Sequence, residues 1–412
     1  MNQREERGWA GFVFLLCLPL ACGGASKPAD QVPGPAESRG GRASDAVEVP
    51  GVSLVTPGGA GGAASETASG SASRRQRTLT RAKAGAAVTP APPTEGLVPY
   101  GLARGAESEL DKRLLGADRA YADGRYQDAV KGYRAAAKMA PGDPAPIVGV
   151  VRASLAGSDV PTDYAARPKS WRAKAWLKEL ARALQLDKNY GPAWLETGRL
   201  QLILGLPNEA LVALAISAKR LPGDAEAASA LGVALLATGD SAGALVNFER
   251  AASLEPDNAE RLSNLGTAYM MRGRVNPAIA AYERAVALTP DDSRAHGDLG
   301  TAFLGANRPD RAMPHLLRAV ALSPKRATYR SNLGYAHQQS GQLEKAIAVY
   351  REALRLDPKL GSAWLNLGTA LARQKKYADA EKAFLRAKKI DPTDPRVIAN
   401  LKDLEELRRP TP

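Results

Sequence analysis

Apolar and small residues recur along the second half of the chain with the spacing of short amphipathic helices. Within residues 259–292, one apolar face predicts a helix over residues 260–272 and a second predicts a helix over residues 276–288. Gly273 marks the turn between them. Pro290 ends the second helix, because proline cannot continue the helical hydrogen-bond ladder. The pattern therefore predicts a pair of helices joined by a tight turn.

This helix pair recurs every 34 residues, in six regular copies that fill residues 191–394 without a gap. The eighth position of each copy is glycine: Gly198, Gly232, Gly266, Gly300, Gly334 and Gly368. The twentieth position is alanine: Ala210, Ala244, Ala278, Ala312, Ala346 and Ala380. Such small residues let two helix backbones approach closely. A period this strict predicts a solenoid, in which each repeat buries its apolar face against its neighbours.

The repeat that begins at Gly361 resembles the tetratricopeptide repeat (TPR) family. Its residues at the signature positions of that family are Trp364, Leu367, Gly368, Leu371, Ala380, Phe384, Ala387 and Pro392. The resemblance covers the chain from about residue 109 onward. It implies an all-α fold, a right-handed superhelix of antiparallel helix pairs with a long concave groove.

Two divergent repeats are predicted before the regular ones, over residues 110–190. Ala117 replaces the usual glycine in the first, and an insertion near residues 157–170 interrupts the second, which resumes with a helix over residues 171–186. After the last regular repeat, residues 395–412 predict a capping helix with a charged outer face and a short tail. Solenoids need such a cap for solubility. We therefore expect about eight repeats plus a capping helix.

Residues 1–22 resemble the signal peptide of a bacterial lipoprotein. Two arginines precede an apolar run over residues 9–21, which is shorter than the stretch of about 20 residues that spans a bilayer. Ala21 is the small residue expected before a lipidated cysteine, and Cys22 would then become the new N-terminus. The resemblance implies a lipid anchor at Cys22. Gly23, in place of aspartate, favours the outer membrane.

Two other interpretations of this segment stay open. A secretion signal cleaved near Ala25 would leave a soluble periplasmic or secreted protein, and an apolar start on a cytosolic protein is the second alternative. The only cysteines, Cys17 and Cys22, lie here, so neither disulfides nor thiol chemistry are expected in the repeats. Residues 23–109 predict a disordered linker, because more than half of them are Gly, Ala, Ser or Pro.

The net charge of +13 lies almost entirely in the repeats. Residues 1–109 hold 11 basic and 10 acidic residues, which leaves +12 for the rest of the chain. A basic solenoid favours acidic partners, such as acidic protein segments or anionic lipid headgroups, although a merely solvated basic face is the alternative. Basic and aromatic residues are not clustered together, which argues against binding nucleic acid through base stacking.

The first helix of each repeat carries the candidate binding residues, since its sixth and ninth positions face the concave side in TPR proteins. In four successive repeats the sixth position is Asn264, Asp298, Asn332 and Asn366. The ninth position is Thr267, Thr301, Tyr335 and Thr369. An amide can donate to and accept from a peptide bond. The row resembles the asparagine ladder of O-linked N-acetylglucosamine transferases, which implies a groove for an extended peptide.

Two alternatives concern this row. Asp298 interrupts it and would favour a basic contact at that point. Asparagine is also a common residue at this position in TPR proteins, where it can simply cap polar groups nearby.

No catalytic, cofactor or metal site is expected. The three histidines are separated by 19 and 22 residues, and the chain has neither an HExxH sequence nor a Cys–His cluster. We therefore expect a non-enzymatic protein–protein interaction scaffold or adaptor, without a small-molecule substrate, tethered to a bacterial envelope membrane. A regulatory or recruiting subunit of an envelope enzyme, such as a glycosyltransferase, is the other function left open.

Overall fold

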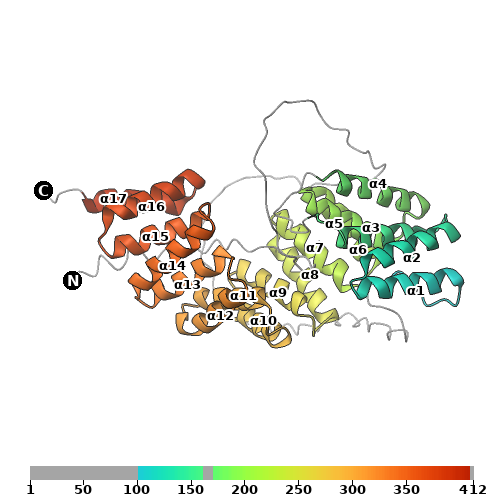
Figure 1. Cartoon of the computed structure of the whole chain (residues 1–412), viewed down its shortest axis with the longest axis horizontal. Coiled ribbons are helices and arrows are strands. Elements are labelled where there is room, and N and C mark those ends of the chain that lie inside the picture. Colours follow the sequence, from blue (N-terminus) through green and yellow to red (C-terminus); the bar gives the residue numbers. More distant parts are fainter. Residues whose placement is uncertain (1–100, 161–169, 409–412) are drawn as a thin grey trace, which may run out of the picture. The chain divides into compact units, whose positions relative to one another are not determined.

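The computed structural model describes residues 101–160 and 170–408, and these residues contain seventeen helices and no strand (Figure 1). The first four helices are α1 (Glu109–Ala122), α2 (Tyr126–Met139), α3 (Pro144–Ala156) and α4 (Trp171–Leu186). Those of the regular repeats are α5 (Gly191–Ile203), α6 (Pro207–Arg220), α7 (Ala225–Ala237), α8 (Ser241–Leu254), α9 (Ala259–Met271), α10 (Val275–Leu288), α11 (Ser293–Gly305), α12 (Pro309–Leu322), α13 (Ala327–Gln339), α14 (Leu343–Leu356), α15 (Gly361–Arg373) and α16 (Tyr377–Ile390). The last is α17 (Pro395–Arg408).

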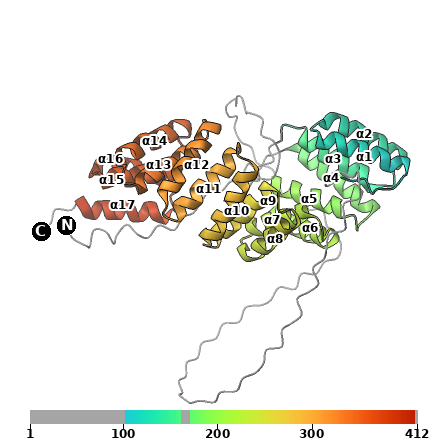
Figure 2. The same ribbon diagram turned by 90° about the horizontal axis from the view of Figure 1, so that it is seen from below.

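Successive helices pack as pairs, and each pair packs against the next. The pairs run from α1 with α2 to α15 with α16, and α17 covers the last pair through contacts with α15 and α16 (Figure 2). Every regular repeat has a first helix of 13 residues and a second of 14, so the 34-residue period of the sequence is repeated in the structure. The predicted all-α solenoid of helix pairs is therefore confirmed.

The glycine at the eighth position of each regular repeat lies against a large side chain of the second helix. A Cβ atom added to Gly334 would lie 2.7 Å from Cε1 of Tyr350, which is closer than such atoms can approach. The corresponding side chains in the other five repeats are Leu214, Phe248, Tyr282, Leu316 and Phe384. The alanines at the twentieth position are fully buried. The close approach predicted for the two helices is thus confirmed.

A residue in the left-handed backbone region follows the first helix of each regular repeat. It is glycine in four of them: Gly205, Gly239, Gly273 and Gly341. In the other two it is Asn307, with φ 55°, and Lys375, with φ 60°. This conformation places the side chain of an ordinary residue against its own backbone, which glycine avoids. The turn therefore costs more at Lys375 than at the glycines.

The second repeat departs from the others where the insertion was expected. Helix α3 ends at Ala156, and α4 begins at Trp171, after Ser170, whose side chain accepts a hydrogen bond from the backbone N–H of Ala173. Residues 161–169 lie outside the described part of the chain. The predicted helix over residues 171–186 coincides with α4.

The packed part of the chain begins earlier than the predicted linker boundary at residue 109. The backbone N–H groups of Leu102 and Ala103 donate to Oδ2 of Asp118, at 2.8 and 2.9 Å. Leu102 is buried, and Arg104 forms an ion pair with Asp143 at 2.7 Å. Composition alone placed residues 101–108 in the linker, because their contacts are specific hydrogen bonds rather than a run of apolar residues.

The predicted signal peptide with Cys22 and the linker up to residue 100 lie outside the described residues, as does the tail after residue 408. Across residues 101–160 and 170–408, no helix is long and apolar enough to cross a membrane.

Candidate functional site

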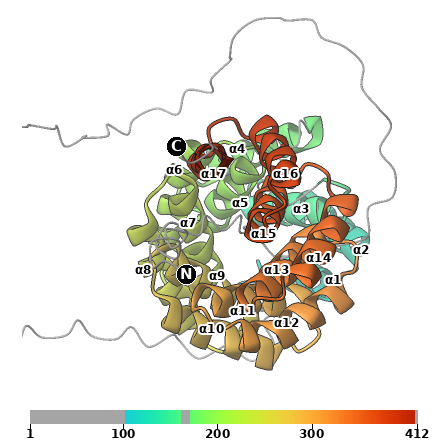
Figure 3. The same ribbon diagram turned by 90° about the vertical axis from the view of Figure 1, so that its left-hand side faces the viewer.

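The first helices of the repeats form the inner side of the solenoid. Figure 3 shows α5, α9, α11, α13 and α15 toward the centre, with α8, α10, α12, α14 and α16 outside them. Neighbouring repeats also touch through their first helices, since α5 contacts α7, α9 contacts α11, α11 contacts α13, and α13 contacts α15. Side chains on these helices can therefore face the inner surface or bridge two repeats, in addition to packing against the second helix of their own repeat.

The predicted asparagine row is partly used to bridge repeats. Nδ2 of Asn332 donates to Oγ1 of Thr301 in the preceding repeat, at 2.8 Å. Nδ2 of Asn264 donates to Oγ of Ser229, at 3.2 Å, and its Oδ1 accepts from Arg294 at 3.3 Å. Asn264 is buried, so its amide is fully engaged inside the protein.

The threonines at the ninth position are buried as well. Oγ1 of Thr267 lies 3.0 Å from the hydroxyl of Tyr282, and Thr301 and Thr369 donate to the backbone carbonyls of Gly297 and Leu365. These hydroxyl groups stabilise the helix pairs. Thr267, Thr301 and Thr369 expose no hydroxyl group to a peptide, and their role in binding one stays a prediction.

Three of the eight predicted groove residues are half-buried and lie toward the C-terminal end of the row: Asn332, Tyr335 and Asn366. A ninth residue extends the row into the capping helix, but it is buried. Asn400 of α17 lies 34 residues after Asn366, and its Nδ2 donates to Oγ1 of Thr369 at 3.4 Å. Extending the 34-residue period into the capping helix would have identified Asn400 from the sequence.

Asp298 interrupts the row with a buried carboxylate. Its Oδ2 lies 3.6 Å from Nε of Arg294, one helical turn earlier in α11. Burial raises the pKa of Asp298 to about 6, in spite of Arg294. The predicted contact of Asp298 with a basic group is thus made within the chain.

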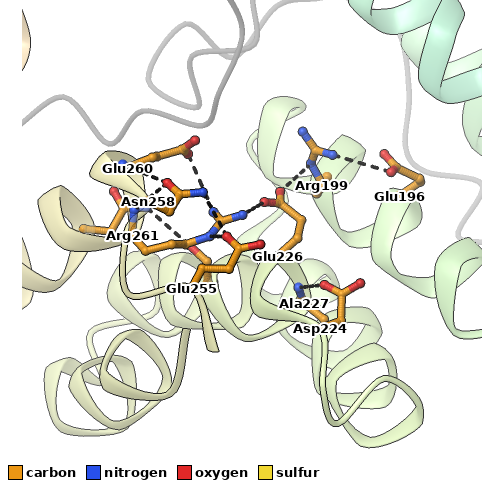
Figure 4. Close-up of polar contacts among 11 residues, drawn as sticks. Glu196, Arg199, Asp224, Glu226, Ala227, Glu255, Asn258, Glu260 and Arg261 are labelled. Atoms are coloured by element: carbon orange, nitrogen blue, oxygen red, sulfur yellow. Dashed lines mark hydrogen bonds and ion pairs between the residues drawn. The ribbon is translucent and has the colours of Figure 1, made fainter. Parts of the chain in front are cut away.

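A row of alternating charges crosses the N-terminal half of the inner side, and sequence reasoning missed it. We call it the ion-pair ladder; its members are Arg152, Glu196, Arg199, Glu226 and Arg261. From α3 to α9 the successive distances are 2.7 Å, 3.5 Å, 3.4 Å and 2.6 Å. Each member lies on a first helix, and three of the four contacts join different repeats. Figure 4 shows the part of the ladder from Glu196 to Arg261.

The end of the ladder is held by a capped helix. Asn258 caps α9 by accepting from the backbone N–H groups of Glu260 and Arg261, and its Nδ2 donates to Glu255. Glu255 in turn lies 3.1 Å from Nε of Arg261 (Figure 4). Arg261 is only 3% exposed, so its charge is neutralised by carboxylates rather than by water.

Two neighbouring arginines favour the ionised form of Glu226, the second carboxylate of the ladder. Burial alone would raise the pKa of Glu226, but Arg199 and Arg261 together hold that pKa below its usual value. The charges of the ladder are therefore paired with each other. A charged partner would have to displace one of them to bind there.

Within the described ranges, no three His, Cys, Asp or Glu side chains are grouped closely enough to hold a metal ion. The arrangement offers hydrogen-bonding amides on a curved helical surface, which suits the recognition of another polypeptide.

The repeated helix pairs and their curved inner surface define a solenoid scaffold for protein–protein interaction. Residues 177–407 match the family model described as "Cilia and flagella-associated protein 70 C-terminal domain", a TPR family. The match covers more than half of the chain, so the chain belongs to this family of TPR domains. TPR domains are generally non-catalytic scaffolds that bind other proteins. No curated protein matches the chain.

One solved structure shares the fold, and others are similar over part of the chain. A chain of the "APC/C hetero-tetramer Cut9-Hcn1" is 18% identical with a TM-score of 0.56, and the similarity covers 73% of this chain and 57% of that one. This chain thus spans little more than half of that relative's length. The Pseudomonas aeruginosa protein pilF is 18% identical with a TM-score of 0.45, covering 54% of this chain and 99% of its own. YrrB, "a TPR protein with an unusual peptide-binding site", is 22% identical with a TM-score of 0.36, covering 46% and 98%.

Proposed function

We propose that this protein is an adaptor that binds an extended segment of a partner protein along the inner faces of α13 and α15. The observation that carries the proposal is that the asparagine row is more exposed on these two helices than on the helices before and after them. Asn264, Asp298 and Asn400 are buried, whereas Asn332, Tyr335 and Asn366 are only half-buried. Half-buried amides keep atoms that can reach the backbone of a bound peptide.

The charge distribution supports the same end of the solenoid. In the N-terminal half, the three arginines of the ion-pair ladder are paired with its two glutamates and with Glu255. In the C-terminal half, the exposed Arg373 stands near the end of α15 and donates to the backbone carbonyl of Gln338, at 3.3 Å. A guanidinium group there favours a partner segment that carries a carboxylate.

The test compares two asparagines of the same row. The protein is used to capture partners from detergent-solubilised bacterial envelopes, and the captured proteins are quantified by mass spectrometry. Asn366→Ala combined with Asn332→Ala should lower capture of the specific partner by about tenfold, since two amide hydrogen bonds contribute roughly 1 kcal/mol or more together. The matched control, Asn264→Ala, removes a buried amide that has no access to a peptide and should capture the partner normally.

Equal capture by the double variant and the wild type, at unchanged circular dichroism, would exclude these asparagines from binding. Loss of capture by the Asn264→Ala control alone would show that stability of the row, rather than contact with a peptide, governs the interaction.

The same proposal places the adaptor on a bacterial envelope membrane, with the outer membrane favoured. It rests on the sequence before the repeats, where an apolar run ends in Ala21 and Cys22, and Gly23 follows. Metabolic labelling with a fatty acid should mark the wild type and leave Cys22→Ser unlabelled. A protein that is unlabelled and found in the soluble periplasmic fraction would favour the secreted alternative.

A further inference from the structure

Two histidines that are 19 residues apart face each other between the two helices of one repeat. Nδ1 of His296, on α11, lies 3.1 Å from Nδ1 of His315, on α12. Their rings stack with centroids 5.3 Å apart. Both belong to the repeat of residues 293–326, where the turn brings the two helices together. Spacing along the sequence concealed the pair, because motif searches look for ligands on one helix or one loop.

We propose that His296 and His315 bind one divalent transition-metal ion of the Zn²⁺, Ni²⁺ or Cu²⁺ type through their two Nδ1 atoms. Imidazole nitrogen is a preferred ligand of these ions. Two nitrogens that each lie about 2.0 to 2.1 Å from a tetrahedral ion are about 3.3 Å apart. The pair therefore needs to open by only a few tenths of an ångström.

The repeat itself fixes the proton on His296. At the same fourth position of two other repeats, the indole N–H groups of Trp194 and Trp364 donate to the backbone carbonyl six residues earlier, both at 2.9 Å. Nε2 of His296 lies 3.0 Å from the carbonyl of Pro290, which is also six residues earlier. A carbonyl only accepts, so Nε2 of His296 carries the hydrogen. Its Nδ1 then presents a lone pair toward His315.

This arrangement matches the surroundings of known metal-binding histidines. Such a histidine usually donates its other ring N–H to a carbonyl or carboxylate, which orients the ring. Pro290 supplies that carbonyl for His296. In the neutral pair, Nδ1 of His315 must donate a hydrogen to His296; an ion would replace this hydrogen, and His315 would carry its proton on Nε2.

The proposed site is accessible from one side and has charged groups near it. His296 is 9% exposed, and His315 is half-buried, so the ion is reachable from solvent at His315. The ring of Phe303 stacks on that of His315. The guanidinium of Arg311 lies over the ring of Phe303, 4.6 Å from its centroid. Nη2 of Arg311 is 3.2 Å from Glu283, which offsets its charge. The two histidines would be the protein's only ligands from the described residues, and water would complete the coordination.

The experiment is a calorimetric titration of the full-length protein with ZnCl₂, and separately with NiCl₂, in a buffer that does not bind metals. The wild type should bind one ion per chain at this pair. His315→Asn should weaken that binding at least tenfold. The matched control is His337→Asn, the remaining histidine, which lies on α13 beside Gln342 and should leave binding unchanged.

A second variant guards against a folding defect. His296→Trp installs the residue that stands at this position in the repeats of Trp194 and Trp364, so the hydrogen bond to Pro290 is preserved while the ligand is lost. It should fold, by circular dichroism, and should bind no more metal than His315→Asn. All variants keep Cys17 and Cys22, so differences among them report on the histidines alone. Equal binding by the wild type and both variants, or no binding by the wild type, would overturn the proposal.

Discussion

Asn332 donates a 2.8 Å hydrogen bond from its Nδ2 to Oγ1 of Thr301, across the boundary between two repeats. The same pairing joins Asn400 to Thr369 at the end of the solenoid. The sixth position of one repeat thus binds the ninth position of the repeat before it. Residues that a peptide-binding row would use are in part the residues that hold neighbouring repeats in register.

The two ends of the asparagine row should respond differently to truncation. Asn264→Ala should lower the free energy of unfolding by about 1 to 3 kcal/mol, because it leaves the buried hydroxyl of Ser229 and the half-buried guanidinium of Arg294 without this partner. Asn366→Ala, at a half-buried position, should change it by less than about 0.5 kcal/mol. Urea unfolding followed by circular dichroism measures both. Equal losses would mean that the two asparagines have the same role.

Gly334→Leu should lower the melting temperature strongly. A Cβ atom at this position already meets the ring of Tyr350 at 2.7 Å, and a branched side chain has no space beyond it. Overpacking of this kind costs about 1 to 3 kcal/mol or more. Gly116→Leu is the control, because an added Cβ there meets nothing within 4 Å. Similar melting temperatures for the two variants would contradict the close packing of α13 and α14.

Lys375→Gly should stabilise the last regular repeat. Lys375 has φ 60° in the turn between α15 and α16, a conformation that costs a non-glycine residue roughly 1 kcal/mol. The reverse change, Gly341→Lys, should lower stability by a similar amount, since Gly341 has φ 75°. A Cβ added there would meet nothing within 4 Å, so the loss would come from the backbone conformation alone. Thermal unfolding of both variants checks the sign. A loss of stability in Lys375→Gly would show that contacts of the lysine outweigh its strain.

Stability of the N-terminal half should fall in mild acid. The pKa of Glu226 is held below its usual value, so its ionised form is favoured by folding. That contribution is present above the ordinary glutamate pKa, about 4.3, and is lost as pH falls through the lower pKa of the folded protein. Glu226→Gln should lose roughly 1 to 3 kcal/mol near pH 7 and show a shallower decline in acid. Urea midpoints from pH 7 to pH 3 measure this; parallel curves for both proteins would exclude the effect.

The fold was predictable because its information is repeated. Six copies at one period fix where each helix begins, and the first helix of the third regular repeat, predicted over residues 260–272, runs from Ala259 to Met271. The small residues at Gly334 and its equivalents revealed which helices approach closely. A departure from the pattern in one repeat does not obscure it, because the other copies retain it.

Contacts between repeats were less predictable, because they depend on how one repeat is rotated against the next. Arg261 pairs with Glu226, 35 residues away, and neither position carries a charge in every repeat. Likewise, the sequence correctly placed Asn264 on a first helix, but its contacts with Ser229 and Arg294 in adjacent repeats could not be predicted from the period. Periodicity describes what the repeats share, and these contacts arise from what they do not share.

The ion-pair ladder should make the N-terminal repeats of the solenoid stiffer than the C-terminal ones. Its contacts cross three successive boundaries, from α3 to α9, and rotation at any of them must separate opposite charges that are largely shielded from water. Farther along, boundaries such as that between Thr301 and Asn332 are joined by neutral hydrogen bonds, which are weaker and more easily re-formed. We therefore expect the N-terminal repeat boundaries to resist rotation more than the C-terminal ones, so that the solenoid would bend most easily along α13 and α15, where we propose that a partner is held.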